Sequence, residues 1–210
     1  MASRRKLLGK AKLYLILDRQ VNTYDELFEI AKKSISAGAD MIQLRDKLGS
    51  AKDILEFSRR ISKLTKGRIL FIVNDRVELA LLSGASGVHV GQEDIPLKWA
   101  RQILGPKAII GVSCQTLAHA QRAAREGADY IGFGSVFKTL TKPQRSPMDL
   151  DSLKKIYNTI KIPVFAIGGI NLKNISQIKA MGVNRAAVCR SVCLAKDIKQ
   201  ATKSFKKILS

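Results

Sequence analysis

Two aspartates follow short apolar runs of this chain at places where they could bind a metal ion. Asp75 comes after the run Ile69–Val73, and Asp94 lies just past Gly87–Val90. If these runs are adjacent strands, both carboxylates reach one ion, and two carboxylates plus substrate phosphate oxygens are what Mg²⁺ usually takes. For either aspartate alone, capping a following helix is the simpler interpretation. Only the pair favours Mg²⁺.

Cationic side chains precede the aspartates. Gln43 and Arg45 are two residues apart in an apolar run that reads as a strand, so both point to one side and Leu44 points to the other. If that side faces a ligand, Arg45 offers a fork of donors that matches phosphate, and Lys47 follows in the loop. The alternative is an outward Arg45 paired with a helix carboxylate, since arginine is mostly exposed.

Glycines later in the chain indicate backbone that approaches another group closely, because glycine has no side chain. They are Gly132, Gly134, Gly168 and Gly169. The last two end the seventh predicted strand, and in barrels of alternating strands and helices the loops after strands seven and eight often bind phosphate. A tight turn would also explain this pair. The stretch TLTK at 139–142 adds two hydroxyls and a cation.

Histidine and cysteine contribute no recognisable zinc site or disulfide framework. The chain has two histidines and three cysteines, Cys114, Cys189 and Cys193, whose spacing is not CxxC. We expect reduced cysteines that serve in packing. His89 lies within the fourth predicted strand, where a hydrogen-bonded packing role is commoner than a role as a base.

Short apolar runs alternate with longer amphipathic segments. The runs read as strands covered on both faces, and they are Leu13–Leu17, Met41–Leu44, Ile69–Val73, Gly87–Val90, Ala108–Val112, Tyr130–Phe133, Val164–Ile167 and Arg185–Cys189. The segments between them read as helices, and they are Tyr24–Ser36, Lys52–Leu64, Val77–Leu82, Leu97–Leu104, Leu117–Arg125, Leu150–Thr159, Ile175–Ala180 and Ile198–Leu209. Thr23 and Asn174 are expected to be helix N-caps.

This alternation predicts an α/β fold with a parallel sheet. Eight such units favour a single compact (β/α)₈ TIM barrel over residues 13–210, preceded by a basic N-terminal extension at 1–12. A recurring helix-end glycine, at Gly38, Gly84, Gly127 and Gly182, supports four repeated units and suits the left-handed conformation. An open doubly wound sheet is the alternative, although no GxGxxG opens the first helix.

The chain is strongly basic. Its 210 residues carry 37 Lys and Arg against 17 Asp and Glu, a net charge of +20. Such a field attracts anions, including nucleic acid and phosphorylated metabolites, although many of these lysines fall on predicted outer helix faces. No apolar stretch approaches the roughly 20 residues that cross a bilayer. We expect a cytoplasmic protein without a membrane partner.

Six motifs in order resemble those of thiamine-phosphate synthases. They are QLRDK at 43–47, VNDRVELA at 73–80, GVHVGQEDIP at 87–96, IIGVS at 109–113, GFGSVFKTLTK at 132–142 and AIGGI at 166–170. The resemblance runs from about residue 13 to the C-terminus. It implies an alkyl transferase that joins an aminopyrimidine methyl diphosphate to a thiazole phosphate with Mg²⁺ as cofactor.

The resemblance also implies residue roles. The pyrimidine diphosphate would be held by Gln43, Leu44, Arg45, Asp46, Lys47, Asn74, Ser113 and Lys142, of which Arg45, Lys47, Ser113 and Lys142 would act in catalysis. Asp75 and Asp94 would bind Mg²⁺. The thiazole phosphate would be held by Thr139, Thr141, Gly169, Cys189 and Arg190.

Two positions depart from the family pattern. Ser135 stands where proline is usual, and Cys189-Arg190 stands where an aliphatic residue and serine are usual.

Two alternative functions are considered. One is a thiazole tautomerase-like paralogue on the same barrel, which tends to lack the diphosphate-binding set. The other is a nucleic-acid-binding protein, for which no recognition motif is seen. We expect small phosphorylated molecules as partners and no specific nucleic acid. The sequence is also compatible with a homo-oligomer.

Overall fold

The computed structural model describes residues 3–140 and 146–210. Its strands are β1 Leu13–Asp18, β2 Met41–Arg45, β3 Leu70–Asn74, β4 Gly87–Val90, β5 Ile109–Cys114, β6 Tyr130–Phe133, β7 Val164–Ile167 and β8 Ala186–Val188. Its helices are α1 Arg4–Lys10, α2 Tyr24–Ser36, α3 Ala51–Thr65, α4 Val77–Ser83, α5 Leu97–Leu104, α6 Leu117–Arg125, α7 Leu150–Thr159, α8 Ile175–Ala180, α9 Arg190–Cys193 and α10 Ile198–Leu209. None of the described helices is long and apolar enough to cross a membrane.

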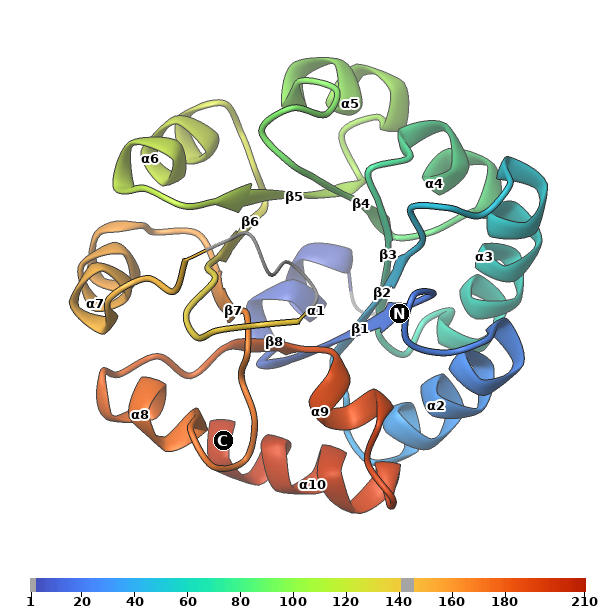
Figure 1. Ribbon diagram of the computed structural model, residues 1–210. Helices are drawn as coiled ribbons and strands as arrows, with labels where there is room; N and C mark the ends of the chain where they lie inside the picture. Colours follow the sequence, from blue (N-terminus) through green and yellow to red (C-terminus); the bar gives the residue numbers. More distant parts are fainter. Residues whose placement is uncertain (1–2, 141–145) are drawn as a thin grey trace.

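The strands form a closed parallel barrel in chain order, and β8 pairs with β1. Figure 1 looks along the barrel and shows α2 to α8 and α10 in a ring outside it. Alternating strand residues face this ring and the interior, so two cores form. The predicted (β/α)₈ barrel is confirmed, and the open doubly wound sheet is wrong.

Three aromatic rings fill the barrel interior. Tyr14, Tyr130 and Phe165 meet edge to face, with ring centroids 5.4–5.8 Å apart. Aromatic rings prefer this arrangement because the positive edge of one meets the negative face of the next. Gly111 leaves room for them, because a Cβ there would lie 2.0 Å from the ring of Tyr130. Packed side chains therefore fill the floor of the barrel.

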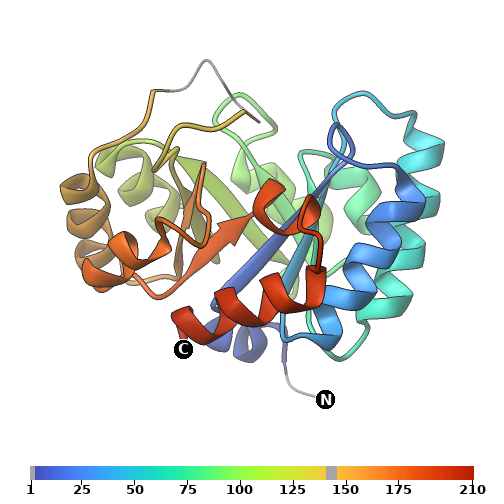
Figure 2. The ribbon, with the colours of Figure 1, turned by 60° about the horizontal axis from the view of Figure 1, so that its bottom comes forward.

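Helix α1 covers the N-terminal end of the barrel. Leu8 and Ala11 are buried in the same cluster as the interior aromatics. Arg185, just before β8, donates to the carbonyls of Leu8, Gly9 and Ala11 at the end of this helix. Figure 2 shows both termini at this end and the segment after β6 at the other. Residues 4–10 are thus packed onto the barrel, and a domain boundary at 12/13 stays a prediction.

The helix caps match expectation in part. The Thr23 hydroxyl accepts from the Glu26 amide at 3.3 Å, and Glu26 accepts from the Thr23 amide at 2.7 Å, which completes a capping box. Asn174 makes no side-chain cap. Its amide group instead donates to the Gly169 carbonyl at 3.0 Å and fixes the loop after β7.

Replacing Gly111 with alanine is expected to lower the free energy of unfolding by about 1–3 kcal/mol, as overpacking of a core does. The added methyl group meets the ring of Tyr130, which three neighbours hold in place. Thermal unfolding measures the effect. Gly9→Ala in α1 is the matched control, since nothing lies within 4 Å of a Cβ there. Equal melting temperatures of Gly111→Ala and the unmodified chain would show that the interior rearranges to accommodate the added methyl group.

Candidate active site

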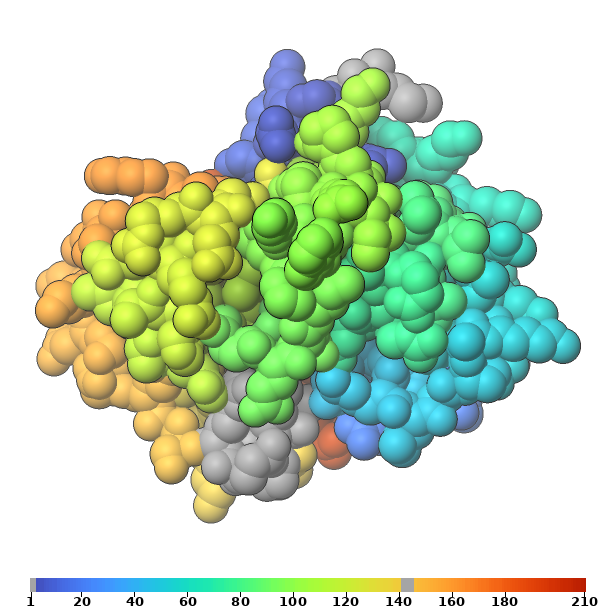
Figure 3. Space-filling model, turned by 90° about the horizontal axis from the view of Figure 1, so that it is seen from above, coloured from blue at the N-terminus to red at the C-terminus, as the bar shows by residue number. Residues whose placement is uncertain are grey.

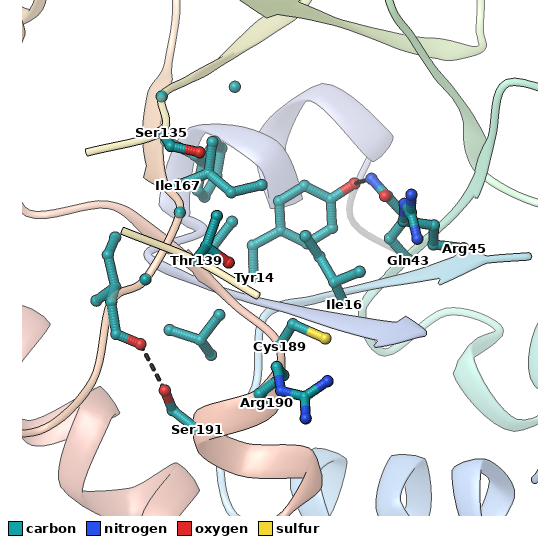
Figure 4. Close-up of a pocket in the computed structure, with 18 of the residues that line it drawn as sticks. Tyr14, Ile16, Gln43, Arg45, Ser135, Thr139, Ile167, Cys189, Arg190 and Ser191 are labelled. Carbon is teal, nitrogen blue, oxygen red and sulfur yellow. Dashed lines mark hydrogen bonds between the residues drawn. The ribbon is translucent and has the colours of Figure 1, made fainter. Parts of the chain in front are cut away.

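A cavity of about 310 Å³ opens at the carboxyl ends of the strands. Interior residues of β1, β2 and β7 form its floor, and the loops after β6, β7 and β8 form one wall. Figure 4 shows Tyr14 and Gln43 at the floor, Thr139 on the loop after β6, Cys189 just before α9 and Arg190 at the start of that helix. Such a cavity at this end of a barrel is the usual position of an active site.

A chain of hydrogen bonds crosses the floor. Gln43 Nε2 donates to the Tyr14 hydroxyl at 2.6 Å, which lies 2.8 Å from the Tyr130 hydroxyl. That hydroxyl lies 3.1 Å from Nδ1 of His89, whose Nε2 lies 2.9 Å from Oγ of Ser113. The five residues come from five different strands.

The two tyrosines in this chain of hydrogen bonds, Tyr14 and Tyr130, are neutral. Burial is the main reason that the pKa of Tyr14 and of Tyr130 lies above the usual value for tyrosine. His89 contacts Tyr130 through Nδ1 and Ser113 through Nε2, so the Ser113 hydroxyl is oriented by a chain of bonds that begins in the barrel interior. His89 is therefore more than a packing residue, because it connects the barrel interior to the cavity.

Arg45 lines the cavity and is held in place from β1. Its Nη1 donates to Oδ2 of Asp18 at 2.8 Å and to the Gln20 side chain at 3.0 Å. The Asp18 side chain is 1% exposed, and that of Arg45 is 11% exposed. An outward Arg45 paired with a helix carboxylate is therefore wrong. The partner lies on the neighbouring strand, and the guanidinium stays at the mouth.

Asp75 and Asp94 are brought together. Asp75 has a left-handed φ of 62°, and its amide donates to the His89 carbonyl at 2.8 Å. Burial raises the pKa of Asp75 above its usual value, and the neighbouring Asp94 raises it further, against an ion pair with Lys47. The side chain of Asp94 accepts from the Gly91 amide. The side chain of neither aspartate caps α4 or α5.

This acidic pair fits a divalent cation. Two neighbouring carboxylates repel each other, and a cation between them would relieve that repulsion. The described residues hold no group of three or more potential His, Cys, Asp or Glu ligands. Two carboxylates with open positions for substrate oxygens suit Mg²⁺, which usually binds one or two carboxylates beside substrate phosphates.

Two of the expected diphosphate ligands face elsewhere. The Leu44 side chain is buried in the cluster between barrel and helices. Asp46 accepts from the Tyr24 hydroxyl and from the Leu48 and Gly49 amides. Burial favours the neutral Asp46, but these hydrogen bonds hold its pKa below the usual value. Neither side chain lines the cavity, and the roles of both residues in substrate binding stay predictions.

The loops after β7 and β8 form the far wall. Gly169 has a φ of 65°, and a Cβ there would lie 2.3 Å from the Lys138 carbonyl, so the loop after β6 packs directly on it. Ser191 in α9 donates to the Ile170 carbonyl at 2.6 Å and joins the two loops. Figure 4 shows this bond below the cavity. Arg190, the first residue of α9, lines the cavity.

Cys189 also lines this wall, in contrast to the packing role expected for all three cysteines. A hydrogen bond with Cys193, together with burial, raises the pKa of Cys189 well above its usual value. The thiol is therefore neutral.

The structure brings most of the predicted residues to one cavity. Gln43, Arg45, Asn74, Ser113, Thr139, Gly169, Cys189 and Arg190 line it. Lys47, Asp75 and Asp94 lie together beside it, and Thr141 and Lys142 lie outside the described residues. Sequence reasoning missed Asp18, Tyr14, Tyr130 and Lys138. Asp18 carried a usable signal, since it directly follows an apolar strand as Asp75 nearly does.

Comparison with known proteins names the family. Residues 13–192 match the family model described as thiamine monophosphate synthase. A thiamine-phosphate synthase of Fusobacterium nucleatum is 37% identical over 95% of this chain and 98% of its own length. One of Pyrococcus horikoshii is 41% identical over 95% of both. One of Gloeobacter violaceus is 42% identical over 96% of this chain, which spans 58% of that longer relative.

Solved structures agree. A thiamine phosphate pyrophosphorylase from Pyrococcus furiosus superposes with a TM-score of 0.87 at 38% identity, over 98% of this chain and 96% of that one. A 3-hexulose-6-phosphate synthase, with a TM-score of 0.74 and 18% identity over 95% of this chain and all of the other, shares the fold. These matches support neither the tautomerase-like nor the nucleic-acid-binding alternative. The chain belongs to the thiamine-phosphate synthase family.

Proposed function

We propose that this protein joins an aminopyrimidine methyl diphosphate to a thiazole phosphate and releases diphosphate and thiamine phosphate. The observation that carries the proposal is one cavity at the strand ends whose lining includes two arginines, Arg45 and Arg190, and the backbone of Gly169. Lys47 and the acidic pair lie beside it. Two phosphorylated substrates can therefore lie with their rings over the cavity floor and their phosphates on separate cations.

The reaction needs one bond to break and one to form. The bond between the pyrimidine methylene carbon and the diphosphate oxygen breaks, and its electron pair leaves with the diphosphate. The lone pair of the thiazole nitrogen then forms a bond with that carbon. Arg45 is positioned to stabilise the charge that grows on the diphosphate, because Asp18 and Gln20 fix its guanidinium.

Mg²⁺ is the cofactor that Asp75 and Asp94 would hold. When bound, it supplies positive charge to the diphosphate oxygens. Lys47 pairs with Asp75 in the structure, and an ammonium group beside the acidic pair can turn to the diphosphate when the carboxylates hold a cation. Its four-carbon stem and rotatable donors allow this exchange.

The floor positions the pyrimidine ring. The Ser113 hydroxyl is directed by His89, and Gln43 is directed by Tyr14. Both groups offer hydrogen bonds to ring nitrogens or the amino group. Tyr14, Tyr130 and Phe165 form an apolar interior below the cavity, which keeps water away from an electron-poor methylene carbon. Holding the thiazole nitrogen opposite that carbon supplies much of the remaining acceleration.

The partners of this protein are small phosphorylated molecules, as the family relationship supports. The cytoplasmic location and a homo-oligomeric state stay predictions. Thr141 and Lys142 also keep their proposed roles, in the thiazole phosphate site and in diphosphate departure.

The direct test mixes both heterocycle phosphates with the purified protein and Mg²⁺ and measures thiamine phosphate by chromatography. We expect product with Mg²⁺, none after removal of divalent ions by a chelator, and recovery when Mg²⁺ is restored. Asp75→Asn and Asp94→Asn should each raise the Mg²⁺ concentration for half-maximal activity. Full turnover without divalent ions would contradict the metal assignment, and no product under any condition would contradict the function.

Replacing Arg45 with alanine should lower kcat by on the order of 10²-fold, as loss of a transition-state donor does. It should also lower the melting temperature, because Asp18 is left buried without its partner, at a cost of about 3–5 kcal/mol. Arg45→Ala with Asp18→Asn should recover stability but not activity. Arg125→Ala removes an exposed arginine of α6 and serves as the control. Recovered activity in the double variant would show that Arg45 acts only through folding.

Arg190→Ser restores the residue usual in the family. If the guanidinium contacts the thiazole phosphate, this contact contributes roughly 1.5–3 kcal/mol. The KM for thiazole phosphate should then rise about tenfold or more, while the KM for the pyrimidine diphosphate stays nearly constant. Steady-state kinetics with each substrate varied in turn measures both constants. An unchanged KM for thiazole phosphate would leave that site to the backbone of Gly169 and its neighbours.

A further inference from the structure

A second hollow lies at the N-terminal end of the barrel, opposite the active site. It measures about 1360 Å³ and lies between α1, the ends of α3 and α4, and the connection from α5 to β5. We name it the basic groove, because six of its lining residues are cations and none is acidic, namely Arg4, Arg5, Arg59, Lys63, Lys66 and Lys107. At the upper edge of Figure 3, blue atoms of the N-terminal segment lie beside green atoms of the α5–β5 connection.

Most of these cations have no partner of their own. Arg5 contacts Asp129 at 3.3 Å, and Arg59 donates weakly to the Leu82 carbonyl at 3.4 Å. Within the described part of the chain, the side chains of Arg4, Lys63, Lys66 and Lys107 make no hydrogen bond or ion pair. Like charges gathered around a hollow repel one another, and an anion between them removes this repulsion.

Two further features distinguish the groove from an ordinary basic surface. The hydroxyl of Ser62, which lines it, is buried and has no hydrogen-bond partner among the described residues. A buried polar atom without a partner costs free energy, which a turn of the Ser62 side chain toward a bound acceptor would recover. The groove also has an apolar side, where Leu81 and Leu82 of α4 are 51% and 56% exposed.

We propose that the basic groove binds a small molecule that carries an oligophosphate chain and an apolar or aromatic group. The cations match several phosphates, and the leucines match a ring. A concave site with an apolar wall and a few convergent polar groups suits a small ligand. The site lies at the other end of the barrel from Arg45 and Arg190, so it can be occupied independently of the proposed reaction.

The test is a calorimetric titration of the full chain with ATP, inorganic triphosphate and adenosine at about 0.15 M salt, where exposed charges are screened beyond about 8 Å. We expect ATP to bind at least tenfold more tightly than either fragment. Lys63→Gln with Lys66→Gln should weaken ATP at least tenfold. Lys199→Gln with Lys203→Gln, which removes the same charge from exposed positions of α10, should change it less than twofold.

Further variants decide between the phosphates, the ring and the active site. Leu81→Ser with Leu82→Ser should remove the advantage of ATP over triphosphate. Arg45→Ala with Asp18→Asn should leave ATP binding intact. The proposal is overturned if both lysine pairs weaken ATP equally, which would reflect only the net charge. It is also overturned if triphosphate binds as tightly as ATP, or if the Arg45 variant abolishes binding.

Discussion

The interior of the barrel contains polar groups that water does not reach, and they are satisfied by one another. Tyr14, Tyr130 and Gln43 are buried in the middle of an otherwise apolar filling. An unpaired hydroxyl there would cost about 1–3 kcal/mol, so the bonds between strands hold each side chain in one orientation. The register of the barrel and the direction of the Ser113 hydroxyl therefore depend on the same chain of hydrogen bonds.

The charged groups at the mouth of the barrel also need partners, because burial makes an unpaired charge costly. Asp18 is buried, and its partner Arg45 must stay near it, which places a guanidinium at the rim. The acidic pair next to it has the opposite problem, since two carboxylates are forced together. In the proposed reaction, a diphosphate with a divalent cation would satisfy both, because the anion would meet Arg45 and the cation would meet the carboxylates. The site is thus arranged for a ligand with separated charges.

The barrel was predictable because its strands are apolar on both faces and its helices are amphipathic. Predicted bounds for α2, α5 and β4 match those observed. Helix α9 was not foreseen, because four residues are too few to show a helical period. Helix α1 was read as a basic extension, since its cations hide the contribution of Leu8. The aromatic floor was also missed, because a tyrosine in a strand carries no sign of which face it occupies or which hydroxyl it meets.

The bonds from Arg185 to α1 carry a consequence for the order of events during synthesis. Arg185 and Leu8 are 177 residues apart in the chain. Strand β1, which begins at Leu13, likewise pairs with β8, which begins at Ala186. At about 5–20 residues per second of translation, the residues of α1 and β1 are synthesised roughly 10–35 s before those of their partners. During that interval the apolar side of α1 and one edge of β1 are uncovered in the nascent chain. The cations around Leu8 give this early segment a positive charge, which opposes association with like-charged chains until the last strand closes the barrel.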